Sequence, residues 1–145
     1  MGINSFKSSG YFFKVLFLAS LMGFGSGVCA QTSEKSSEVS EAPVTSRVLP
    51  NDPGRTLTAV LVELAPGAKA GSHHHAGIVF AYVLEGTIRS QLNKGEVVEY
   101  RAGQYWVESP GAEHTLTQNA SQTLPARLLA VFIAPTGAQL TTYDP

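Results

Sequence analysis

The chain has 145 residues, which is room for one domain and an appendage but not for two catalytic domains, because a single core usually takes about 100 to 150 residues. Hydrophobic residues make up 43% of the sequence and charged residues 14%, a balance that supports a folded core and excludes a wholly disordered chain. The formal net charge is -1 and the basic residues form no cluster, which argues against a nucleic-acid partner.

The N-terminus has the three parts of a secretory signal peptide. Lys7 and Lys14 precede a short apolar run over residues 15–24, and small residues follow up to Ala30. A membrane-spanning helix needs about 20 predominantly apolar residues, and this run ends sooner in a glycine-rich stretch. We therefore predict that residues 1–30 are a signal peptide cleaved after Ala30, and that the mature protein is periplasmic or secreted and free of the membrane.

The single cysteine, Cys29, lies beside the predicted cleavage site. The residue before a lipid-bearing cysteine is normally small, whereas Val28 stands here, so the sequence disfavours a lipoprotein but leaves that alternative open. Cleavage after Ala30 would leave the mature protein without cysteine, and therefore without disulfides or thiolate chemistry.

Residues 31–50 are rich in serine and glutamate and contain almost no large apolar side chains. Such a segment cannot bury enough surface to offset the entropy that it loses on ordering. We predict a disordered linker over 31–50, closed by the turn-forming residues Pro50 to Gly54, and a folded domain over 51–145.

From Thr56 onward, short β-prone runs alternate with glycine, proline and asparagine. Seven such runs at nearly regular intervals, without sustained helical periodicity, predict an all-β sandwich or closed barrel. The predicted strands are 56–64, 78–84, 87–92, 96–100, 104–107, 113–118 and 126–134.

Three of the four histidines, His73, His74 and His75, are consecutive and lie between two predicted strands. Side chains alternate along an extended segment, so His73 and His75 share one face while His74 points away. The fourth, His114, opens the predicted strand 113–118. A single histidine is more often a surface or packed residue than a metal ligand, so the metal hypothesis depends on the surrounding pattern.

Two segments resemble the motifs of the cupin family. Residues 67–86 carry Gly, five residues, His-x-His and a strand that ends in Gly, which is similar to the first motif. Residues 103–119 carry Gly, Pro-Gly and then a histidine, which is similar to the second. The resemblance implies a double-stranded β-helix, or jelly-roll barrel, whose metal is held by His73, His75 and His114.

The first motif departs from the family pattern. Its usual glutamate, four residues after the second histidine, is replaced by Val79. Three neutral ligands would leave a divalent ion with its full charge, so we predict a three-histidine centre that is more electropositive than usual and attracts an anionic or enolisable substrate. In the second motif, Gln118 holds the usual asparagine position and Asn119 lies beside it.

The ligand types restrict the metal without deciding it. Imidazole suits Fe, Ni, Zn and Cu, and we predict one divalent ion, either Fe, Mn, Ni or Zn. Three convergent nitrogens leave coordination sites open for water or substrate.

The resemblance implies a metal-dependent enzyme that acts on a small organic molecule, with dioxygenase-like chemistry favoured. Three alternatives stay open, because fold does not determine function: a non-catalytic module that binds a small ligand, a zinc-type lyase or hydrolase, and a barrel with a vestigial triad that serves only assembly. The resemblance also implies a homodimer. Six side chains are predicted to line the substrate pocket, although aromatic residues in strands are more often core: Val79, Tyr82, Arg89, Gln104, Trp106 and Phe132.

Overall fold

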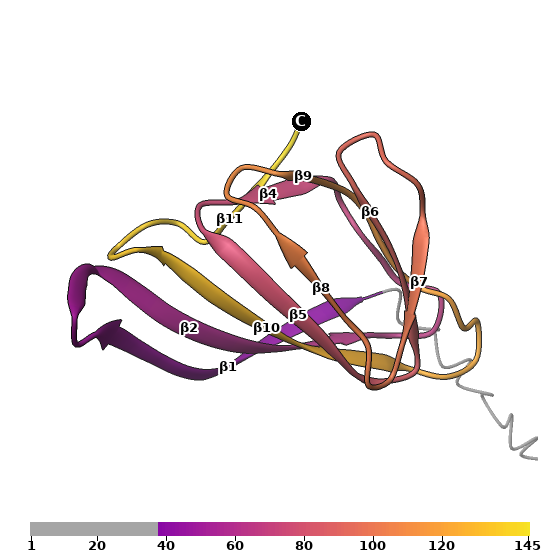
Figure 1. Ribbon diagram of the computed structural model, residues 1–145. Coiled ribbons are helices and arrows are strands. Elements are labelled where there is room, and N and C mark those ends of the chain that lie inside the picture. The colour runs from indigo at the N-terminus through magenta and orange to yellow at the C-terminus, as the bar shows by residue number, and fades with distance from the viewer. Residues whose placement is uncertain (1–37) are drawn as a thin grey trace, which may run out of the picture. The chain divides into compact units, whose positions relative to one another are not determined.

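The computed structural model describes residues 38–145 (Figure 1). The predicted signal peptide, its cleavage site after Ala30 and residues 31–37 of the predicted linker lie outside this part of the chain. The described residues form eleven strands, so the prediction of an all-β fold is confirmed. Within 38–145 we find no helix with the length and apolar character needed to cross a membrane.

The strands follow in the order β1 (Val39–Leu49), β2 (Asp52–Leu64), β3 (Lys69–Ala70), β4 (His73–His75), β5 (Ile78–Glu85), β6 (Thr87–Leu92), β7 (Val98–Arg101), β8 (Tyr105–Glu108), β9 (Glu113–Asn119), β10 (Ala126–Pro135) and β11 (Thr141–Tyr143). All seven predicted strands are present, with ends that differ by a few residues at most. Four further strands, β1, β3, β4 and β11, were not predicted as strands.

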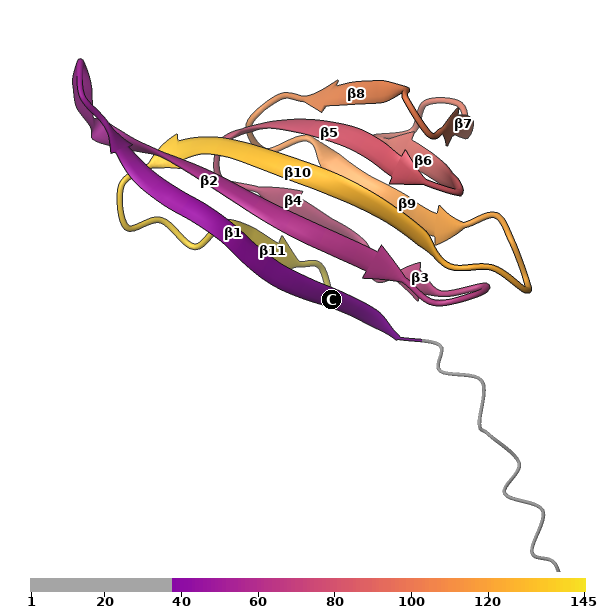
Figure 2. The same ribbon diagram turned by 90° about the horizontal axis from the view of Figure 1, so that it is seen from below.

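These strands form two antiparallel sheets that face each other. The first has the order β1-β2-β10-β5-β8, in which all five strands lie side by side in Figure 2. The second has the order β11-β4-β9-β6-β7, with β3 also paired to β9. Strands far apart in the sequence are neighbours in both sheets, which is the topology of a double-stranded β-helix and confirms that prediction.

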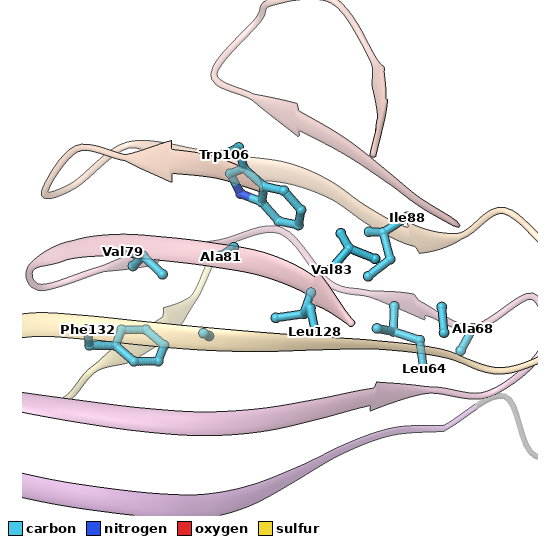
Figure 3. Packing of buried hydrophobic residues seen from close by; sticks show 11 residues of the cluster. Leu64, Ala68, Val79, Ala81, Val83, Ile88, Trp106, Leu128 and Phe132 are labelled. Carbon is cyan, nitrogen blue, oxygen red and sulfur yellow. The ribbon is translucent and has the colours of Figure 1, made fainter. Parts of the chain in front are cut away.

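The core lies between the sheets because apolar residues alternate along the strands. In β10 every second side chain from Ala126 to Ala134 is buried, as expected for a strand with one face on a core. Leu64 and Val83 of the first sheet meet Ile88 of the second, and all three are fully buried (Figure 3). Each such side chain contributes about 1.5 to 3 kcal/mol on burial.

The two ends of the core differ. Figure 3 shows Leu64, Val83 and Ile88 gathered at one end of the cluster, while Val79 and Phe132 lie at the other. The Leu64 end is closed by apolar packing. The end with Val79 and Phe132 borders the histidines.

Residues 39–49 show that part of the predicted linker is wrong. They form β1, which pairs with β2 along its length. Most β1 side chains are exposed, Val44 and Val48 among them, but the main chain supplies the hydrogen bonds of a ladder and needs no buried side chains. Pro43 is tolerated because β1 is an edge strand and its register is irregular there. The barrel therefore begins before residue 51.

The outer face of β5 and β8 is unusually apolar for an exposed surface. Phe80 and Tyr105 are 39% and 58% exposed, and their ring centroids are 5.3 Å apart. Ile78 and Val107 extend this face, and both are also exposed. Exposed apolar patches often mark interaction surfaces. Homodimerisation nevertheless stays a prediction from the family resemblance.

Candidate metal centre

Three histidine side chains meet between the two sheets. His73 and His75 lie on β4, and His114 lies on the neighbouring strand β9, where it is the register partner of His73. One ligand atom from each residue lies within 4.8 Å of the others, and all three side chains are buried. The structure therefore brings together the three residues that the sequence singled out.

His74 points away from this cluster, as the alternation along β4 predicts. Its Nδ1 lies 3.0 Å from Oδ1 of Asp144, and the hydroxyl of Ser72 donates to Oδ2 of the same carboxylate at 2.9 Å. The Ser72 hydrogen bond, and then the contact with His74, hold the pKa of Asp144 below its usual value. These contacts fasten the C-terminal strand β11 against β4.

The hydrogen bonds of His73 and His75 orient both rings for metal binding. Nδ1 of His73 lies 2.8 Å from the carbonyl oxygen of Gly71, and Nδ1 of His75 lies 3.2 Å from that of Leu140. A carbonyl can only accept, so each Nδ1 carries the hydrogen and each Nε2 keeps a lone pair. Burial lowers the pKa of His73 and of His75, which leaves both rings neutral at pH 7 and able to coordinate.

His114 is held by two buried hydroxyls. Its Nε2 lies 2.8 Å from Oγ of Ser90 and 3.0 Å from Oγ1 of Thr117. The ring edge of His114 also contacts Trp106, with centroids 6.0 Å apart. With Nε2 engaged by hydroxyls, Nδ1 is the nitrogen that faces the opposite sheet.

Glu108, on β8 of the opposite sheet, lies in the same cluster and was not predicted. Its side chain is 2% exposed. Oε1 accepts a hydrogen bond from Nε1 of Trp106 at 2.9 Å and lies 3.2 Å from Nδ1 of His114. Oε2 lies 3.7 Å from Nε2 of His75 and has no hydrogen-bond partner among the described residues.

This carboxylate corrects the prediction of a centre built from neutral groups alone. Burial favours the protonated form of Glu108, but the hydrogen bond and charge of His114 outweigh it, so the pKa is lowered. Glu108 is therefore ionised at pH 7 and adds one negative charge to the cluster. A divalent ion there would keep a net charge of about +1 rather than +2.

A sequence signal for Glu108 existed but was missed. The predicted strand 104–107 ended one residue too early, whereas β8 runs through Glu108. Side chains alternate along a strand, so an inward Trp106 places Glu108 on the same inward face. A glutamate two residues from a buried tryptophan would have marked the carboxylate.

The histidines and Glu108 lie in a cavity of about 60 Å³ whose other walls are mainly apolar. Phe132 borders the metal cluster, since its ring centroid is 5.2 Å from that of His75. Two unpredicted segments also contribute, because β1 and β11 supply part of the lining. The side chains from these two strands are Val39, Glu41, Thr141 and Tyr143.

Three of the six predicted pocket residues, Val79, Trp106 and Phe132, line this cavity. The other three do not. Tyr82 lies on the outer face of β5, where its ring stacks near that of Phe80. The exposed side chain of Arg89 pairs with Glu99 at 2.9 Å, and Gln104 accepts a hydrogen bond from the main chain of Arg101 in a turn. Tyr82 and Arg89 point away from the cavity because side chains alternate between the two faces of a strand, and Gln104 lies in a turn.

The groups present fit a divalent cation. Three buried imidazoles converge, the buried carboxylate of Glu108 lies beside those of His75 and His114, and its Oε2 has no hydrogen-bond partner among residues 38–145. A buried charged oxygen without a partner costs more than about 1 to 3 kcal/mol, so native proteins rarely keep one without a bound ion or water. A cation between the sheets would give Oε2 a partner together with Nε2 of His73 and Nε2 of His75, which the hydrogen bonds of Nδ1 leave free.

Comparison with solved structures supports the same fold. An uncharacterised double-stranded β-helix protein from Klebsiella pneumoniae is 22% identical, with a TM-score of 0.59 over 74% of this chain and 85% of that one. The TT1209 protein from Thermus thermophilus is 28% identical, with a TM-score of 0.53 over 68% and 84%.

An oxalate decarboxylase from Lactobacillus farciminis, solved as a formate complex, is also similar. It is 23% identical with a TM-score of 0.52, and the match covers 60% of this chain but only 26% of the decarboxylase. At this identity the likeness extends to the fold alone.

Among curated protein sequences we find no significant match. The family model described as "Cupin domain" matches residues 60–132, which include both motifs and all three clustered histidines. The match spans half of the chain and agrees with the sheet topology. The chain therefore belongs to the cupin family.

Proposed function

We propose that this protein is a metal-dependent enzyme with dioxygenase-like chemistry, which acts on a small organic anion. The proposal depends on one observation, the convergence of His73, His75 and His114 on a mainly apolar cavity. A bound Fe or Mn ion would supply Lewis acidity and one-electron chemistry at this point.

The side chains of the chain itself define the rest of the site. His73, His75 and His114 would hold the ion, since their rings are buried and oriented by hydrogen bonds. Val79 and Phe132 exclude water from the space beside them, which strengthens electrostatic interactions there.

Charge and space favour a small anion. A divalent ion would exceed the single negative charge that Glu108 adds to the cluster, and Glu41 of β1 also lines the cavity. A cavity of about 60 Å³ suits a small molecule. The oxalate decarboxylase shares the fold and is named for a small carboxylate substrate, which supports this choice of substrate class.

The proposal can be tested with untagged protein, because added histidines would bind metal themselves. Elemental analysis identifies the bound ion, and an oxygen electrode then measures O2 uptake with a panel of small carboxylic acids and enols. We expect Fe or Mn and O2 uptake with at least one anionic compound. Loss of metal from His75→Ala without loss of that activity would show that the proposal is wrong.

Other outcomes of this test point to two of the alternatives. Bound Zn with turnover that consumes no O2 would indicate a lyase or hydrolase. Binding of a small ligand to protein that takes up no metal, even after reconstitution, would indicate a non-catalytic module. Either result replaces the dioxygenase-like proposal.

Ser90 provides a milder test of the same centre. The change Ser90→Ala removes the hydroxyl 2.8 Å from Nε2 of His114, so the ring loses a group that fixes its orientation. Such partners of metal-binding histidines typically contribute about 10 to 100-fold in affinity. We expect a loss of that size in Zn2+ affinity by calorimetric titration.

Ser46→Ala is the matched control for this substitution. The exposed hydroxyl of Ser46 bonds to Thr58 on β2, far from the histidines in the sequence. Its removal should leave the Zn2+ affinity unchanged. Equal affinities of the Ser90 and Ser46 variants would contradict the assigned role of Ser90.

A further inference from the structure

We propose that Glu108 is a fourth metal ligand, a carboxylate that β8 supplies in place of the one that the first cupin motif usually supplies from the position of Val79 on β5. The inference rests on the metal centre of the proposed function and adds a ligand to it. Val79 occupies the position at which the first cupin motif usually carries glutamate, and Glu108 is the residue directly opposite Val79. The cluster thus keeps a carboxylate although the first motif lacks one.

Strand pairing explains how the exchange preserves the site. Val79 on β5 and Glu108 on β8 are register partners in an antiparallel pair. Residues paired in this way point to the same face of the sheet, with Cβ atoms about 4.5 to 5.5 Å apart. Both side chains are buried, at 1% and 2% exposure, and both line the cavity that holds the histidines.

The two oxygens of Glu108 have different roles. Trp106 donates to Oε1 from Nε1 at 2.9 Å, and this bond holds the carboxylate in place. Oε2 is left without a hydrogen-bond partner among the described residues, 3.7 Å from Nε2 of His75. That separation is too long for a hydrogen bond, and an ion bound to both atoms would account for it.

A simpler role for Glu108 would be to position His114. Carboxylates often accept the free N–H of a metal-binding histidine, and Oε1 lies 3.2 Å from Nδ1 of His114. This role explains Oε1 only. It leaves Oε2 buried without a partner, whereas a metal bound to Oε2 would supply one while Trp106 holds Oε1.

The experiment relocates the carboxylate. Co2+ is titrated into wild-type protein, Glu108→Val and the double variant Val79→Glu/Glu108→Val, and both affinity and visible absorption are recorded. We expect Glu108→Val to lose at least about 100-fold in affinity, because even groups that only orient ligands cost about 10 to 100-fold. The double variant should recover affinity to within about tenfold of wild type, with a wild-type-like absorption spectrum.

Glu113→Gln is the matched control. Glu113 is next to His114 in the sequence but its side chain is exposed, so the variant should bind Co2+ as wild type does. An unchanged affinity of Glu108→Val would overturn the proposal. So would a folded double variant that binds no better than Glu108→Val.

Two further results keep the test decisive. Thermal unfolding shows whether the double variant folds, and if it does not, Glu108→Gln replaces it. An amide oxygen is a weaker ligand, so reduced affinity and a shifted Co2+ spectrum would support the proposal, while unchanged values would overturn it. If wild-type protein binds no Co2+, the metal centre itself is wrong; if wild type binds and Glu108→Val binds equally, only the fourth ligand is wrong.

Discussion

Replacement of His75 by alanine is expected to reduce the affinity for a divalent metal by more than about 100-fold, since loss of a ligand exceeds the 10 to 100-fold cost of losing its outer partners. The His75 ring is buried, its Nδ1 faces the carbonyl of Leu140, and its Nε2 faces the cluster. Burial lowers its pKa, so at pH 7 the ring competes for metal as the neutral base. Metal content after dialysis and calorimetric titration with Zn2+ measure the effect.

His74→Ala is a close control, because it changes the neighbouring imidazole in the same strand. His74 points away from the cluster and contacts Asp144 at 3.0 Å. Its loss should leave the metal affinity within about threefold of wild type, since the effect of exposed charges is small. Equal losses in the two variants would mean that the tripeptide binds metal without regard to the face on which each ring lies.

The sequence predicted the central strands well because their signals are local. Runs of alternating apolar residues, broken by glycine and proline, mark the seven strands that line the core. Gly86 is an example of such a break. It turns the chain between β5 and β6 with φ of 74°, a conformation that favours glycine.

The edge strands could not be predicted in the same way. β1 lies in a segment rich in serine and glutamate, which predicts a linker, and its order comes from pairing with the main chain of β2, which composition does not reveal. β11 is three residues long and is held by pairing to β4 and by contacts of Asp144. Both strands contribute to the cavity, so their part of its lining was the least predictable part of the site.

The metal cluster was predicted in part for a related reason. Motif spacing identified His73, His75 and His114, because each motif is continuous in the sequence. Glu108 reaches the cluster from the facing sheet through its pairing opposite Val79. The first motif alone shows that valine stands where glutamate is usual. Only the register between β5 and β8 places another carboxylate, that of Glu108, opposite Val79.

Asn119→Ala is expected to lower the free energy of unfolding by about 2 to 4 kcal/mol, among the larger effects of a single substitution. The Asn119 side chain is fully buried. Its Nδ2 lies 3.1 Å from the carbonyls of Leu64 and Ala65 and 2.8 Å from that of Leu124. Its Oδ1 accepts the main-chain N–H of Ser121. One amide thus ties the end of β2 to the loop before β10.

Gln118→Ala is the control, and it tests whether stability depends on the hydrogen bonds of Asn119 or on the position at which the second cupin motif usually has asparagine. Gln118 stands where the second cupin motif usually has asparagine, yet its side chain is only partly buried and lies on the opposite face of β9 from Asn119. Urea denaturation of metal-free protein should show a change below about 1 kcal/mol for Gln118→Ala. If the two variants were equally destabilised, the hydrogen bonds of Asn119 would not be what holds the loop. If only Asn119→Ala is destabilised, the buried amide at position 119 holds it, because side-chain alternation buries position 119 and not 118.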